Sequence, residues 1–145
     1  MIYLGCDHGG FALKKVIGAY LQQQGQTVTD CGNTVFDADD NFSDFVAPVV
    51  KGVKADPANR GILICGSGVG MCIAANHYAG IRAAVVHNED YARLVRQHND
   101  ANVLCLGGRF VDEVSAKKIV DLFLTTAVDA NPKYKQRMNA VDGSK

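Results

Sequence analysis

The sequence lacks an excess of charge of either sign. Its 145 residues include 15 Lys and Arg against 15 Asp and Glu, which gives a formal net charge of zero. Proteins that bind nucleic acid usually carry a basic patch that neutralises phosphates, and no dense run of Lys or Arg occurs here. We therefore expect no nucleic-acid partner. An anionic ligand is expected to be small and held by a few placed groups.

Long apolar runs and paired cysteines are also missing. The apolar runs are far shorter than the roughly 20 residues that span a bilayer, and no signal-peptide pattern precedes Asp7 and His8. No CxxC pair and no Cys/His cluster with zinc-ligand spacing occurs. We expect no membrane partner, no metal and no cofactor, and a cytoplasmic location with reduced thiols. The five thiols are those of Cys6, Cys31, Cys65, Cys72 and Cys105.

What the sequence does have is a regular alternation of short apolar runs and amphipathic stretches. Strands are expected at residues 2–6, 27–30, 61–65, 81–86 and 102–106, and helices at 11–24, 43–53, 70–78, 89–97, 113–126 and from about 132. Ser43 is expected to cap the second helix, with Pro48 in its second turn. Such alternation predicts an α/β fold: one doubly wound, Rossmann-like domain over residues 1–145. Its five-stranded parallel sheet would have helices on both faces and a C-terminal helix.

Ligands in such sheets bind beyond the carboxyl ends of the strands. This rule selects four short segments that follow strands, at residues 7–10, 31–33, 65–70 and 107–109.

The third of these segments has the strongest local pattern. The three glycines of residues 66–70 permit a sharp turn that presents N–H groups at a helix N-terminus, which suits an anion or an oxyanion. The spacing is neither GxGxxG nor that of a P-loop, and a tight turn without a ligand remains the alternative. Cys65 lies directly before the turn, where a helix N-terminus favours the thiolate, and Ser67 adds a hydroxyl. A base, a hydroxyl and backbone donors suit removal of a proton next to a carbonyl.

Other polar residues are candidates for substrate contacts. His8 follows Asp7 at a strand end, and His98 lies in a dense polar stretch that is costly to bury unless its groups meet each other or a ligand. Arg109, and Lys133 and Arg137 four residues apart on the last helix, suit phosphate binding. For the two helix residues, a solvated basic face is the alternative.

Several segments resemble, in order, the motifs of the type B ribose-5-phosphate isomerase and galactose-6-phosphate isomerase family. They are GCDHGGF at 5–11, GILICGSGVGM at 61–71, IAAN at 73–76, GIRAA at 80–84 and QHNDANVL at 97–104. The resemblance covers nearly the whole chain.

The resemblance implies a role for each matching residue. Cys65 would be the proton-abstracting base, Ser67 would help to hold the enediolate, and His98 would open the sugar ring. Met71 stands where some members carry an alternative Glu base. Substrate or phosphate contacts are implied for Asp7, His8, Gly66, Ser67, Gly68, Val69, Gly70, Asn99, Arg109, Lys133 and Arg137.

The implied activity is that of a sugar-phosphate aldose–ketose isomerase in carbohydrate metabolism. The reaction would convert ribose 5-phosphate to ribulose 5-phosphate through a cis-enediolate, as in the pentose phosphate pathway. The family further implies a homodimer or homotetramer whose site is completed across an interface by His98 or the C-terminal helix.

Two departures from the family pattern leave the substrate open. KYKQR at 133–137 stands in place of RHxxR, and NFSD at 41–44 in place of DYPD. The alternatives are the same chemistry on a hexose 6-phosphate of the galactose or allose type, or on a tetrose phosphate. From other classes, the alternatives are a non-catalytic nucleotide- or phosphate-binding module and a thiol redox protein. The lack of a second cysteine beside Cys65 counts against the redox protein.

Overall fold

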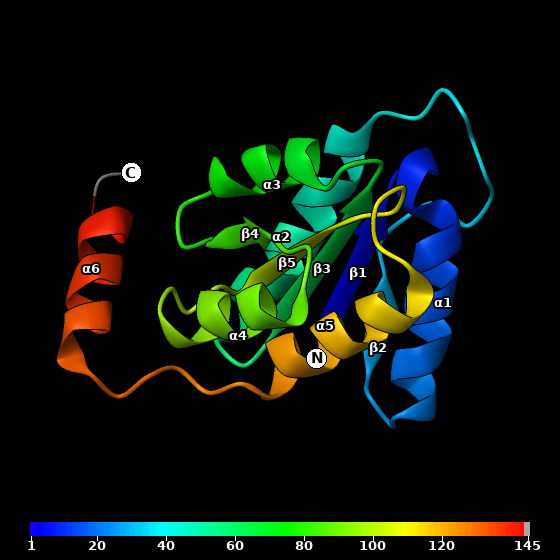
Figure 1. Ribbon diagram of the computed structural model, residues 1–145. Coiled ribbons are helices and arrows are strands. Elements are labelled where there is room, and N and C mark those ends of the chain that lie inside the picture. Colours follow the sequence, from blue (N-terminus) through cyan, green and yellow to red (C-terminus); the bar gives the residue numbers. More distant parts are fainter. Residues whose placement is uncertain (144–145) are drawn as a thin grey trace.

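Five parallel strands form the central sheet of the computed structural model, which describes residues 1–143. The strands are β1 (Ile2–Cys6), β2 (Val28–Asp30), β3 (Arg60–Cys65), β4 (Ala83–Val85) and β5 (Val103–Gly107). Their order across the sheet is β2-β1-β3-β5-β4 (Figure 1). The predicted doubly wound parallel sheet is confirmed.

Helices cover both faces of this sheet (Figure 1). The α-helices are α1 (Phe11–Gln23), α2 (Val46–Ala55), α3 (Val69–Asn76), α4 (Glu89–Gln97), α5 (Glu113–Thr125) and α6 (Pro132–Asp142), and the 3-10 helices are η1 (His8–Gly10) and η2 (Phe42–Phe45). Side chains of α1, α4 and α5 pack in one core cluster, and those of α2 and α3 in another. No helix within residues 1–143 is long and apolar enough to cross a membrane.

The middle strand β3 contributes side chains to both core clusters. Successive side chains of a strand point to opposite faces, so Ile62 and Ile64 enter one core while Leu63 and Cys65 enter the other. The register pairs Cys6 with Ile64 and Cys65 with Gly107. The carboxyl ends of β1, β3 and β5 are therefore nearly level, which gathers the loops that follow them.

The start of the second helix differs from the expectation. Ser43 is not its cap: the Asn41 side chain caps η2 by accepting a hydrogen bond from the Ser43 N–H at 3.2 Å, and α2 begins only at Val46. Pro48 consequently lies in the first turn of α2, where a missing N–H removes no intrahelical hydrogen bond.

The edge strand β4 is shorter than the predicted 81–86. The Arg82 N–H donates to Oδ1 of Asn102 at 2.9 Å, and the Ile81 N–H donates to the Tyr78 carbonyl. Side-chain and turn partners thus take the backbone N–H groups of Ile81 and Arg82, and the registered pairing with β5 begins at Ala83.

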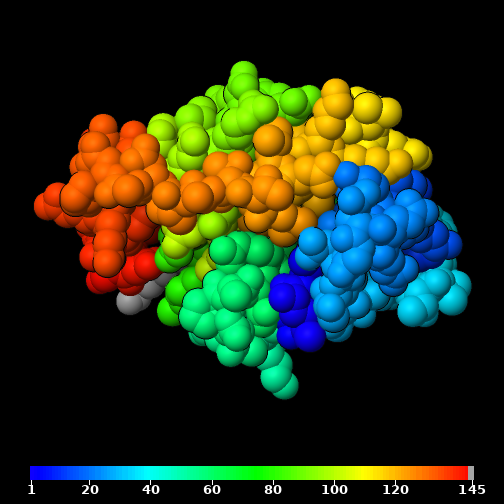
Figure 2. All heavy atoms as spheres, turned by 90° about the horizontal axis from the view of Figure 1, so that it is seen from below, coloured from blue at the N-terminus to red at the C-terminus, as the bar shows by residue number. Residues whose placement is uncertain are grey.

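Helix α6 lies at one end of the molecule, beyond β4 and α4 (Figure 1). The chain that follows α5 runs along the surface to reach it (Figure 2). The side chain of Asn131 caps α6 and Pro132 occupies its first turn, but α6 buries none of its residues. Its position therefore depends on a few specific contacts.

Candidate active site

Three glycine-containing loops meet at the carboxyl edge of the sheet. The Gly108 N–H donates to the Cys65 carbonyl at 2.8 Å, and the Arg109 N–H to the Gly66 carbonyl at 3.2 Å. A Cβ on Gly9 would lie 2.6 Å from the Gly66 nitrogen, and one on Gly108 would lie 2.4 Å from the Gly9 carbonyl oxygen. Only residues without a side chain allow this approach.

Cys65 is the last residue of β3 and is 5% exposed. Its Sγ accepts a hydrogen bond from the Gly68 N–H at 3.1 Å. Gly68 has a left-handed φ of 80°, which glycine adopts without steric cost, and α3 begins at the next residue. The turn thus directs a backbone donor and the positive end of a helix toward the sulfur.

Ser67 and Arg109 lie beside this sulfur-bearing turn. The Ser67 Oγ accepts a hydrogen bond from the Val69 N–H at 3.3 Å, at the N-terminus of α3. A Cβ on Gly66 would lie 3.3 Å from the Arg109 Cζ, so the exposed guanidinium covers the first residue of the turn. An anion bound here would meet a hydroxyl, a guanidinium and backbone dipoles.

The loop after β1 contributes a buried carboxyl group. Asp7 is 6% exposed and its Oδ1 accepts a hydrogen bond from the Gly10 N–H at 3.1 Å. Burial raises the pKa of Asp7 above its ordinary value, although the hydrogen bond from Gly10 works in the opposite direction.

The imidazole of His8 is oriented by a residue that the sequence did not single out. Nδ1 of His8 lies 2.8 Å from Oδ1 of Asp40, which also accepts the His8 backbone N–H at 3.0 Å. The other oxygen of Asp40 accepts from the side chain of Asn33 at 2.8 Å. With Nδ1 paired to a carboxylate, Nε2 is the nitrogen that remains for a ligand.

Within residues 1–143 no group of three or more His, Cys, Asp or Glu side chains is placed to hold a metal ion.

The remaining predicted site residues gather elsewhere. His98 and Asn99 follow α4 and precede β5, so they lie toward the amino end of the strand whose carboxyl end pairs with Cys65. The length of β5 separates the two ends by roughly 15 Å, since a strand rises about 3.3 Å per residue. Lys133 and Arg137 lie on α6, which contacts the His98 loop.

The structure thus divides the predicted residues into two groups. The cysteine cluster consists of Asp7, His8, Cys65, Gly66, Ser67, Gly68, Val69, Gly70 and Arg109. The histidine cluster consists of His98, Asn99, Lys133 and Arg137.

Tyr134 lies at the centre of the histidine cluster. Its ring stacks on the imidazole of His98, with ring centroids 4.3 Å apart and planes inclined by 7°. The Lys133 Nζ lies 4.8 Å and the Arg137 Cζ 5.9 Å from the centroid of the same ring. His98 and Tyr134 help to line a groove of about 500 Å³ between α6 and the loop before β5.

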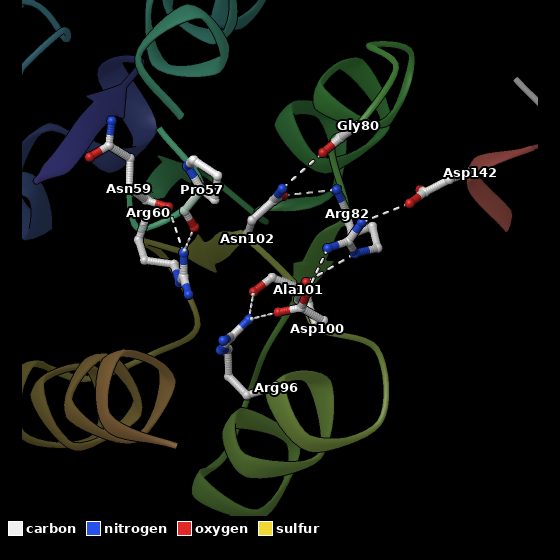
Figure 3. A network of polar contacts seen from close by, with 10 residues as sticks. All are labelled: Pro57, Asn59, Arg60, Gly80, Arg82, Arg96, Asp100, Ala101, Asn102 and Asp142. Atoms are coloured by element: carbon white, nitrogen blue, oxygen red, sulfur yellow. Dashed lines mark hydrogen bonds and ion pairs between the residues drawn. The ribbon is translucent and has the colours of Figure 1, made fainter. Parts of the chain in front are cut away.

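A network of ion pairs fixes both sides of this groove (Figure 3). Arg82 donates from Nη2 to Oδ2 of Asp100 at 2.8 Å and from Nη1 to Oδ2 of Asp142 at 2.9 Å. Arg96 holds the other oxygen of Asp100 at 2.7 Å. Arg82 therefore joins the loop that carries His98 to the last residue of α6.

Comparisons with known proteins find a matching family and several relatives. A family model described as Ribose/Galactose Isomerase matches residues 2–141. A protein of Mycoplasma genitalium named probable ribose-5-phosphate isomerase B is 48% identical over 124 residues, covering 85% of this chain and 82% of that protein. Ribose-5-phosphate isomerase B of Escherichia coli (strain K12) is 43% identical over 140 residues, covering 97% of this chain and 93% of that protein.

A solved structure agrees over almost the full length. The crystal structure of ribose-5-phosphate isomerase B from Mycoplasma genitalium with bound ribulose-5-phosphate matches with a TM-score of 0.94 and 42% sequence identity. The match covers 99% of this chain and 94% of that chain.

Proposed function

Because this chain belongs to the ribose/galactose isomerase family, we propose that it interconverts ribose 5-phosphate and ribulose 5-phosphate. The observation that carries the proposal is the close match to a relative whose structure holds ribulose 5-phosphate. The cysteine cluster adds chemical support, because it combines a thiol, a hydroxyl, a guanidinium and backbone donors at one edge of the sheet. Five free thiols fit a reducing cytoplasm as the place of action.

In the proposed mechanism, the Cys65 thiolate removes the proton from C2 of the open-chain aldose. The electron pair of the C2–H bond forms the C1–C2 double bond of a cis-enediolate, while the pair of the C1 carbonyl bond moves to O1. A proton then passes from O2 to O1, the C2 carbonyl forms, and the same thiol returns its proton to C1 to give the ketose. The Ser67 hydroxyl and the amides of the glycine turn would hold the enediolate oxygen. The short contact between the Gly68 N–H and Sγ supports the assignment of the base, because it directs a positive dipole at the sulfur.

The separation of the two clusters supports a further part of the proposal. His98, as the group that opens the sugar ring, has to reach a sugar that lies at Cys65. We propose that two copies pair so that the histidine cluster of one copy completes the cysteine cluster of the other, in a dimer or a dimer of dimers. The apolar side chains of Val69 and Ile73, one helical turn apart on α3, are 47% and 59% exposed, and they suit such an interface.

Under this proposal the cationic side chains bind phosphate. Arg109 would meet the substrate from the cysteine cluster, and Lys133 and Arg137 would meet it from the partner copy. Lys133 supplies a point charge where a guanidinium would supply a bidentate fork, so its contact with phosphate is less directional.

The proposed function is tested with the purified protein and a panel of sugar phosphates, each assayed in both directions. The panel contains ribose 5-phosphate, galactose 6-phosphate, allose 6-phosphate and a tetrose phosphate. We expect the highest kcat/KM for ribose 5-phosphate. A higher value for a hexose or tetrose phosphate would reassign the substrate, and nucleotide binding without any turnover would overturn the isomerase assignment.

The assignment of the base has its own test. Cys65→Ala is expected to abolish exchange of solvent deuterium into ribulose 5-phosphate, followed by NMR, while the variant still binds the sugar phosphate. The matched control is Cys31→Ala, which removes a half-buried thiol outside the proposed site. Exchange at the wild-type rate in Cys65→Ala would show that another group moves the proton.

A further inference from the structure

The ring of Tyr134 has a position that the proposed function does not explain. It is half-buried, while most residues of α6 are exposed, and it stacks nearly parallel on the imidazole of His98 at 4.3 Å. The two rings are therefore in direct stacked contact, an arrangement that is attractive when the ring centres are offset.

The stack is the contact that orients this imidazole. Within residues 1–143 neither ring nitrogen of His98 forms a hydrogen bond. The backbone N–H of His98 donates to the Leu94 carbonyl. The imidazole of His8 is oriented by a hydrogen bond instead, because its Nδ1 lies 2.8 Å from Oδ1 of Asp40. A carboxylate fixes an imidazole by occupying one of its nitrogens, whereas a stacked ring fixes the plane and leaves both nitrogens for proton exchange.

The two partners of the stack are held independently of the stack itself. Arg82 and Arg96 grip Asp100, two residues after His98, and Arg82 also binds Asp142 at the end of α6 (Figure 3). The Asp129 N–H adds a hydrogen bond to the Gln97 carbonyl at 3.0 Å. These contacts hold the loop that carries His98 and helix α6 at a spacing that lets the rings of His98 and Tyr134 stack.

From this geometry we propose that Tyr134 is a positioning residue for ring opening, which it serves by holding the plane of the His98 imidazole. The proposal rests on the proposed function. In the step itself, the O1 hydroxyl of the furanose loses its proton, the C1–O4 bond breaks and O4 gains a proton. The product is the open-chain aldehyde. An imidazole with both nitrogens available can take the first proton and supply the second.

The two sugars of the reaction separate this role from that of Cys65. Ribose 5-phosphate is mostly a closed furanose and has to be opened before C2 can lose its proton. Ribulose 5-phosphate stays open, because its O5 carries the phosphate and no hydroxyl is left to close a five-membered ring on C2. Exchange of solvent deuterium into ribulose 5-phosphate therefore reports proton abstraction without ring opening.

The test compares Tyr134→Ala, Tyr134→Phe and the matched control Tyr91→Ala, which truncates a tyrosine that is 58% exposed on α4. Tyr134→Ala is expected to lower kcat for ribose 5-phosphate by about 10- to 100-fold, the loss typical of a misplaced catalytic group. Its exchange into ribulose 5-phosphate should stay within about twofold of the wild type. Tyr134→Phe keeps the stacked ring and should restore turnover, and Tyr91→Ala should leave both rates unchanged.

Three outcomes would overturn the positioning role. They are full turnover of ribose 5-phosphate by Tyr134→Ala, an equal fall of turnover and exchange, and an equal rise in KM for both sugars with kcat unchanged. The last result would show that the Tyr134 ring supports phosphate binding by positioning Lys133 and Arg137. A wild-type protein that neither turns over nor exchanges either sugar would instead overturn the proposed function.

Discussion

At the scale of single residues, four of the five thiols have a pKa that is shifted from the ordinary value of a cysteine. Burial raises the pKa of Cys6 to about 11 and raises that of Cys31, and it raises the pKa of the fully buried Cys105 well above its ordinary value. Cys72 is the opposite case, because a hydrogen bond from the Cys105 thiol lowers its pKa to about 7. Cys72 is also only half-buried.

These differences predict an order of alkylation. Among Cys6, Cys31, Cys72 and Cys105, iodoacetamide at pH 7.5 should modify Cys72 first, since only the thiolate reacts. The rate should rise as the pH passes through about 7, where Cys72 loses its proton. Peptide mapping by mass spectrometry measures the order, and Cys72→Ser should abolish the early product. First labelling of Cys6 or Cys105 would contradict the assignment.

The residues whose place at the carboxyl edge of the sheet could be predicted from the sequence are those that end or closely follow a strand. Cys65, Asp7 and Arg109 come within two residues of a strand end, and the parallel arrangement of the strands brings such positions together. Asp40 could not be found this way, because it lies in an irregular loop and meets His8 across 32 positions. Tyr134 appeared in the sequence only as a departure from the family pattern, and its partner is known only from the packing of α6.

At the scale of elements, strands could be predicted from the sequence, whereas loops and helix caps could not. The core strands and the helices around them follow from apolar periodicity, which records burial directly. The expected helix start at Ser43 was wrong, and the chain before α2 instead brings Phe42 against the glycine turn: a Cβ on Gly70 would lie 3.1 Å from its ring. That contact belongs to tertiary structure, and a 3-10 helix as short as η2 leaves no periodic pattern in the sequence.

Helix α6 gives a prediction at this scale. A helix of 11 residues with no buried side chain is marginal on its own, so the ion pair between Arg82 and Asp142 should matter for its docking. Asp142→Asn is expected to speed hydrogen–deuterium exchange of the α6 amides. The melting temperature should fall by no more than about 3 °C, since a partly exposed ion pair contributes about 1 kcal/mol at most.

A matched substitution separates docking from a general charge effect. Asp90→Asn removes the carboxylate of an exposed ion pair with Arg93 on α4 and should leave exchange in α6 unchanged. Unaltered α6 exchange in Asp142→Asn would show that the stack of Tyr134 on His98 is sufficient to hold the helix.

At the scale of the whole molecule, the fold assigns opposite ends of β5 to the two halves of the proposed site. Neither cluster is complete alone, because one holds the proposed base and the other holds the proposed ring-opening imidazole. The separation of roughly 15 Å along a strand is too long for side chains to bridge within one chain. The family resemblance implied that His98 or the C-terminal helix completes the site across an interface. The structure supplies the physical reason, because α4 leads into the amino end of β5 whereas Cys65 lies at the carboxyl end of the sheet.

This division predicts complementation between two inactive variants. Cys65→Ala and His98→Ala should each turn over little ribose 5-phosphate. After the two proteins are mixed in equal amounts, unfolded and refolded together, about one quarter of the wild-type activity should return. Half of the dimers are then mixed, and each mixed dimer has one site with both residues intact and one with neither.

The control mixes Cys65→Ala with Ser67→Ala. Both of these residues belong to the cysteine cluster, so no intact site forms in any dimer and activity should stay at the level of the separate variants. Native mass spectrometry confirms in each mixture that mixed dimers have formed. If mixed dimers of Cys65→Ala and His98→Ala form and remain inactive, His98 does not act on a sugar bound at the partner's Cys65. The proposed pairing of the two clusters across an interface would then be wrong.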